Sequence, residues 1–305
     1  MKKLLTITLL LTSTFTFAQK VKIQLNLKKD SVYRLVTTGK LTVVQDIPGH
    51  NQTVDVVIDA DVRHKVIAIR DTIYDMEVTY ASMAMHMGVG GQNIDISTND
   101  QTNPMSKILS SFLNTPFNMS ISRSCRVISV SGVEKIYDNM AAGMKGMSDA
   151  QKTQFRSQIE RSFGERSIKN NFQEAFAVFP KNNTGVNDTW TAVNEMESSG
   201  INAQFKTTYT LKEIGAHTLI IHADAVVTPQ PVSGYRGVSG MEMRYTNVKG
   251  AETSDVKLDR NTCWILESKV NKNLSGTVDI KDSPKIPGGM TFPMTITGTI
   301  TTAGK

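Results

Sequence analysis

Apolar and polar residues alternate over long stretches in the first third of the chain. The alternation is clearest at residues 21–27, 54–58 and 76–80. A period of two puts successive side chains on opposite faces, as in a half-buried strand. Pro48 and Gly49 mark a turn between two such stretches, because proline fixes its own φ and glycine tolerates positive φ. We therefore expect a meander of long antiparallel strands over residues 21–98.

The pattern changes to helical spacing in the middle of the chain, between residues 133 and 179. Apolar residues recur there every three or four positions. They are Val133, Ile136, Tyr137, Met140, Met144, Phe155, Ile159, Phe163, Ile168, Phe172 and Phe176. Pro180 closes this region, since proline cannot continue the hydrogen-bond ladder of a helix. The Phe and Met side chains are expected to form core rather than a cofactor site.

Two similar hairpins carry the two cysteines of the chain. Residues 117–132 predict a strand, a tight polar turn with Cys125 and a returning strand, and residues 254–270 repeat this outline around Cys263. From about residue 183 onward the chain again alternates like strands. We interpret it as two related β-rich halves around a helical middle.

This pattern predicts an α+β fold. We expect two related, strongly curved antiparallel sheets, each resembling a half-barrel, with the helical segment packed against them. The corresponding divisions are a leader at 1–18, a β-rich half at 19–132, a helical segment at 133–180 and a second β-rich half at 181–305.

The N-terminus has the features of a secretory signal peptide. Lys2 and Lys3 precede a short apolar run that ends at the small residue Ala18, and cleavage there would leave Gln19 first. The run is short for a membrane span, and no second stretch approaches that length. We expect an exported protein, periplasmic or extracellular, that is soluble after cleavage and not integral to the membrane.

Charge argues against a nucleic-acid partner. The formal net charge is +6, and Lys2 and Lys3 account for two of these charges. The remaining basic residues are interleaved with acidic ones, which is typical of a solvated surface rather than of a basic patch.

Two cysteines in an exported chain suggest a disulfide. Cys125 and Cys263 would meet if the two hairpins packed about a local two-fold axis. The alternative is two free thiols in separate turns, each acting as a small apolar residue. Neither cysteine has the neighbouring histidine or cationic turn that would indicate an activated thiolate.

A methionine-rich strand, residues 83–87, is the most distinctive candidate site. In an extended strand Met83, Met85 and Met87 share one face, and His86 lies on the other. Thioethers are soft ligands suited to Cu(I). Methionine is also an adaptable apolar side chain, so core packing or the lining of a lipid site is the favoured interpretation.

Several short motifs resemble those of DUF6263, an uncharacterised family of exported proteins known mainly from Bacteroidetes-type bacteria. They are LKKDSVYRL at 27–35, GVNDTW at 185–190 and IPGGMTFPMTITGTI at 286–300. The resemblance implies glycine in the turn of each closing hairpin, where Cys125 and Cys263 stand here. It implies no catalytic residue and no substrate.

No catalytic motif or cofactor fingerprint is recognisable in the sequence. A curved sheet covered by helices leaves an apolar concavity, as in the lipoprotein carriers of the bacterial envelope. We therefore expect a non-enzymatic envelope or secreted binding protein for a lipid or other hydrophobic small molecule, without cofactor or metal. The alternatives are an interaction module that binds an envelope protein, and Cu(I) handling.

Overall fold

A computed structural model gives the fold of the chain. It describes residues 20–305, except 111, 143–147, 150, 154–155, 158–159, 161–163, 199–200, 232–233 and 239–240. The signal-like segment ending at Ala18 and Gln19, and the helical positions Met144, Phe155, Ile159 and Phe163, lie outside the described residues.

The described residues form a 13-stranded antiparallel sheet. Its strands are β1 (Val32–Ile47), β2 (His50–Arg70), β3 (Ile73–Val89), β4 (Gln92–Ser97), β5 (Phe117–Ser122), β6 (Val127–Ser131), β7 (Thr189–Ser198), β8 (Ile201–Ile214), β9 (Thr218–Pro229), β10 (Arg236–Val238), β11 (Met241–Asp259), β12 (Ile265–Ile280) and β13 (Met290–Gly304). They are ordered β6-β5-β3-β2-β1-β13-β12-β11-β9-β8-β7, with β4 paired to β3 and β10 to β11. The meander expected over the first third is present as β1 to β4.

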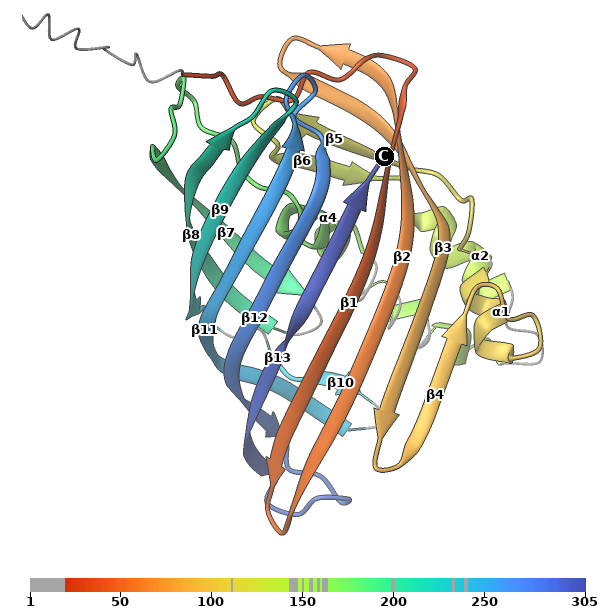
Figure 1. The fold of residues 1–305 in the computed structure, drawn as a ribbon. Helices are drawn as coiled ribbons and strands as arrows, with labels where there is room; N and C mark the ends of the chain where they lie inside the picture. The colour runs from red at the N-terminus through yellow and green to blue at the C-terminus, as the bar shows by residue number, and fades with distance from the viewer. Residues whose placement is uncertain are drawn as a thin grey trace, which may run out of the picture.

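Within the described residues, three helices lie on one side of the curved sheet (Figure 1). They are α1 (Pro104–Ser110), α2 (Glu134–Ala142) and α4 (Glu165–Ala175). Helix α4 contacts both β6 and β7, the two strands that end the order of the sheet. It therefore connects opposite ends of the same sheet.

The prediction of an α+β fold with two sheets was wrong, because the two β-rich halves share one sheet. The first long strand, β1, pairs with the last, β13, from Leu35 opposite Gly304 to Gln45 opposite Met294. This ladder joins β2 and β3 to β11 and β12 without interruption. The alternating pattern identifies strands, but it carries no information on which strand is the partner of which.

The N-terminal segment is extended and buried without joining the sheet. Ile23, Leu25 and Leu27 are buried as their alternation predicts. The backbone N–H of Leu25 donates to Arg123 O at 2.8 Å, and that of Asn26 donates to Thr262 O at 2.9 Å. The segment thus lies between the two cysteine-bearing turns, and the strand predicted for it is an irregular extended stretch instead.

Two groups of buried side chains make up the core. The larger one combines the N-terminal segment, α2, α4 and strands from both ends of the sheet, including the aromatic residues Phe172, Phe176 and Trp264. The smaller one lies on β8 to β13 and includes Phe292 and Met294. Met290 and Ile296 pack against this smaller core, on the same face of β13 as Phe292 and Met294.

Candidate functional site

The strand registers define an inner face of the sheet, the side on which the helices pack. Leu35, Val62 and Tyr80 are opposite one another in β1, β2 and β3 and belong to this face. The outward face is polar. Thr38 donates to Asp59 at 2.5 Å there, and Arg34 forms an ion pair with Asp61 at 2.6 Å.

Beyond the buried side chains of the larger core, the inner face is apolar on five neighbouring strands, β4, β3, β2, β1 and β13. We call this surface the apolar strip. Helix α1 contacts β4. The residues of the strip are Leu41, Val43, Val54, Val56, Ile58, Met83, Met85, Met87, Val89, Ile94, Ile96, Ile296 and Ile300. Each of them is half-buried or exposed, and Ile58 and Ile94 are 39% and 44% exposed. From Met83 to Val89 the strip extends roughly 20 Å, and it is about as wide.

An apolar surface of this extent is unusual. Isolated exposed apolar residues are normal, but a contiguous patch of several hundred Å² marks a place where a ligand or partner binds. The apolar concavity expected from the sequence stays a prediction. Within the described residues the strip is an open surface rather than an enclosed lipid cavity.

The three methionines considered as a weak copper-site candidate lie in this strip. Met83, Met85 and Met87 face Ala60, Ile58 and Val56 of β2. His86 is on the outward face, where it forms an ion pair with Asp95. No cluster of three His, Cys, Asp or Glu side chains suited to a metal occurs in the described ranges. Whether the thioethers bind copper remains a prediction.

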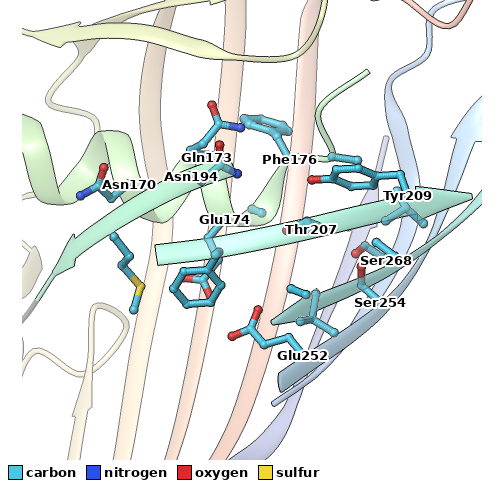
Figure 2. Close-up of a pocket in the computed structure, with 18 of the residues that line it drawn as sticks. Asn170, Gln173, Glu174, Phe176, Asn194, Thr207, Tyr209, Glu252, Ser254 and Ser268 are labelled. Atoms are coloured by element: carbon cyan, nitrogen blue, oxygen red, sulfur yellow. The ribbon is translucent and has the colours of Figure 1, made fainter. Parts of the chain in front are cut away.

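A small pocket lined by both apolar and polar side chains adjoins the strip on the other half of the inner face, where its Val270 lies opposite Ile300 of the strip. It lies between α4 and strands β7, β8, β9, β11 and β12, and has a volume of about 70 Å³. That space holds roughly five ordered waters and is well below the size of a pocket for a lipid. Figure 2 shows Glu174, from α4, and Glu252, from β11, among its lining residues.

One buried lysine forms ion pairs with both Glu174 and Glu252. Lys272 Nζ lies 2.9 Å from Glu252 Oε1 and also forms an ion pair with Glu174. The side chains of Lys272 and Glu252 are only 9% and 8% exposed. The Oε1 atoms of both glutamates make no well-aligned hydrogen bond with the described part of the chain. Sequence reasoning missed this cluster because its members are 78 and 20 positions apart, measured from Glu174 to Glu252 and from Glu252 to Lys272.

Burial changes the protonation chemistry of the cluster. Desolvation raises the pKa of Glu252 to about 7 and lowers the pKa of Lys272 to about 8, since each charged form loses its hydration. Perturbed groups that line a pocket are candidates for a functional site.

The two cysteines are buried in the larger core and occupy equivalent turns. Cys125 lies between β5 and β6 and Cys263 between β11 and β12, with φ values of 62° and 52°. Both therefore adopt the left-handed conformation that favours glycine, at the positions where the family resemblance implies glycine. The structure has both as free thiols. The disulfide stays a prediction.

None of the helices in the described ranges has the length and hydrophobicity needed to cross a bilayer.

Two proteins of known structure have a remote likeness to this chain. An outer membrane channel from Pseudomonas putida F1 aligns with 8% identity over 92% of this chain and 98% of that chain, with a TM-score of 0.29. OpdQ from Pseudomonas aeruginosa aligns with 6% identity over 92% and 99%, with a TM-score of 0.17. Scores this low do not place the chain in either fold.

Family membership is clearer. No curated protein matches the chain. A family model, described as a family of unknown function, matches residues 71–265. Since that match covers well over half of the sequence, the chain belongs to the family of unknown function DUF6263.

Proposed function

We propose that the protein is a non-enzymatic, exported binding protein that holds a hydrophobic small molecule along the apolar strip. The observation that carries the proposal is the strip itself. Thirteen aliphatic and thioether side chains on five strands form one contiguous, incompletely buried surface. The signal-like N-terminus, with Lys2, Lys3 and Ala18, supports a place outside the cytoplasm.

The composition of the strip suits a flexible apolar ligand. Its members are Leu, Ile, Val and Met, which bind through burial and dispersion rather than through directed hydrogen bonds. Methionines are unbranched and adapt to irregular shapes. Each methylene group transferred from water to such a surface contributes about 0.8 kcal/mol. A ligand with an alkyl chain would therefore bind with useful affinity without a shape-specific pocket.

Binding of a neutral dye to the purified protein, starting at Gln19, tests the proposal. N-phenylnaphthylamine fluoresces in apolar surroundings, and we expect saturable binding. Met85→Lys should weaken binding at least about tenfold, because it places a charge in the middle of the strip. Ala84→Lys is the matched control: its side chain lies on the outward face of the same strand, opposite Asp59. It should change the dissociation constant less than twofold.

Two results would contradict the proposal. One is wild-type protein that does not bind the dye. The other is equal weakening by Met85→Lys and Ala84→Lys, which would place the dye elsewhere or indicate a general loss of structure. Native mass spectrometry of protein exported by its own host provides an independent check, since a retained ligand adds its mass to that of the chain.

A further inference from the structure

The apolar strip and the buried cluster are parts of one transverse row of the sheet. Residues directly opposite one another on successive strands form this row across the inner face. In order from β4 to β7 they are Ile94, Met87, Val56, Leu41, Gly298, Lys272, Glu252, Ala225, Thr207 and Ala192. The row changes from apolar to charged at Gly298, so the end of the strip borders Lys272.

At Gly298, the boundary between the strip and Lys272 carries no side chain. A Cβ atom at this position would lie 2.1 Å from Lys40 O and 2.8 Å from Leu41 Cα. Backbone atoms cannot yield as a flexible side chain does, so the row has no side chain between Leu41 and Lys272. The inner face is therefore continuous from the alkyl side chains of the strip to the charged cluster.

The cluster has two carboxyl groups and only one ammonium group. Two carboxylates, Glu174 and Glu252, share the single ammonium group of Lys272, which leaves a net charge of −1 when all three are ionised. An uncompensated charge in a buried site is costly. The adjoining pocket is also lined by hydrogen-bonding side chains, among them Asn170, Asn194 and Ser254.

We propose that the ligand of this protein is an amphiphile with a protonated amine headgroup, bound so that its alkyl chain lies on the strip and its ammonium group sits beside Glu252 and Glu174. The proposal rests on the proposed function, which supplies the site for the chain. The cavity of about 70 Å³ accommodates a headgroup but not an alkyl chain, so the two parts of the molecule have different places. A cation there would neutralise the cluster and donate to carboxylate oxygens that Lys272 leaves incompletely satisfied.

Displacement of N-phenylnaphthylamine by three surfactants of equal chain length tests the headgroup. Dodecylamine, dodecanol and dodecanoate share one tail and carry a positive, a neutral and a negative head at neutral pH. We expect dodecylamine to displace the dye at a concentration about tenfold lower than dodecanol, the effect of roughly one charge-assisted hydrogen bond. Dodecanoate should be weaker than dodecanol.

Glu252→Gln identifies the group responsible. The variant should lose the preference for dodecylamine over dodecanol, measured as the ratio of their displacement concentrations in the same protein. Glu242→Gln is the control: Glu242 also lies on β11 and pairs with a lysine, Lys281 at 2.6 Å, but that pair is exposed. It should keep the preference. If Glu252→Gln does not fold, Glu174→Gln on α4 replaces it, with the same expectation.

The outcomes separate the two proposals. Dye binding that is displaced equally by all three surfactants, or best by dodecanoate, would overturn the headgroup site and leave the apolar strip supported. A preference for dodecylamine over dodecanol that persists in both Glu252→Gln and Glu174→Gln would also overturn the headgroup site and leave the apolar strip supported. Failure of the wild-type protein to bind the dye would instead overturn the proposed function.

Discussion

His64 is a fully buried histidine among aromatic side chains. It packs edge-on against Phe172 and Trp264, with ring centroids 5.5 and 5.3 Å away. Its Nδ1 donates to Tyr33 O at 3.3 Å, and Nε2 has no hydrogen-bonding partner among the described residues. Burial lowers the pKa of His64 from 6.5 to about 4. The neutral imidazole is therefore the form that the folded protein accommodates.

We predict that His64 makes the protein less stable in mild acid. Between pH 6.5 and 4 the unfolded chain binds a proton at this residue and the folded chain does not, so the free energy of unfolding falls as the pH falls. The full contribution is about 3 kcal/mol. Denaturant unfolding of wild type and His64→Gln should show a stability difference that shrinks by about 2–3 kcal/mol from pH 7 to pH 4.5.

Glu252 changes the free energy of unfolding in the opposite direction over much of the same pH range. Its pKa is raised from 4.5 to about 7 in the folded state, so the stability it contributes is lost as the pH rises through that interval. The net pH dependence of the wild type can therefore be nearly flat, and only the difference between variants isolates His64. His217→Gln, at an exposed position, controls for the loss of a histidine. If the stability difference between wild type and His64→Gln does not change with pH, His64 takes up a proton in the folded protein as it does in the unfolded chain, which would contradict the prediction.

The cysteines give a second prediction at the level of single residues. Burial raises the pKa of both thiols, so little reactive thiolate is present in the folded protein. We predict that a disulfide-exchange reagent such as Ellman's reagent detects no thiol in the native protein and two in denaturant. A count of zero in denaturant, restored to two by a reductant, would instead demonstrate the Cys125–Cys263 bond that the sequence suggests.

At the level of elements, the pairing of β1 with β13 depends on a glycine. We predict that Gly298→Ala costs about 1–3 kcal/mol of unfolding free energy, because the new Cβ overlaps the backbone at Lys40 and Leu41. Gly39→Ala is the matched control on the facing strand, where a Cβ would make ordinary contacts with Ile300 Cγ1 at 3.7 Å and Ile58 O at 4.0 Å. That change should be close to neutral, since alanine also restricts the unfolded chain. Equal destabilisation by both substitutions would indicate that any side chain disturbs this ladder.

Helix α4 contacts the strands at both ends of the sheet, which gives a fourth measurable consequence. Phe172 is buried and contacts His64, Phe117 and Phe176. We predict that Phe172→Ala lowers the unfolding free energy by about 3–5 kcal/mol, the usual range for a buried aromatic. Glu165→Ala, at an exposed position on the same helix, should cost less than about 1 kcal/mol. Similar losses for the two variants would mean that α4 does not contribute its buried face to stability.

The sequence predicts where helices, strands and turns occur better than it predicts which segments pair with one another. The strands of the first third, the two cysteine-bearing turns and the helical spacing around Ile168 and Phe172 all follow from local periodicity. Residues 21–27 have the same periodicity as a strand, yet their backbone groups bond to two turns from distant parts of the chain. Periodicity reports which side chains are buried, and it cannot report where the backbone hydrogen bonds go.

At the level of the whole molecule, the candidate site depends on long-range register. The methionines were recognisable because they lie two positions apart in one strand. The charged cluster and its connection to the strip were not, because Leu41 meets Gly298 and Lys272 meets Glu252 only through the ladders β1–β13 and β11–β12. A shift of one residue in either ladder would move these side chains to the outward face. The single sheet that replaced the two predicted ones is therefore also what assembles the site.

The extent of the strip sets an expected limit on ligand length. If alkyl chains lie along it, affinity should rise by about 0.8 kcal/mol, or roughly fourfold, with each added methylene, since each one leaves water. The rise should end when the extended chain reaches roughly 20 Å, the span from Met83 to Val89. Dye displacement by a series of neutral alkyl alcohols of increasing length measures this directly. A plateau near that length would support an alkyl chain lying on the strip. An increase that continues past it, or affinity that does not depend on length, would show that the strip is not where the chain binds.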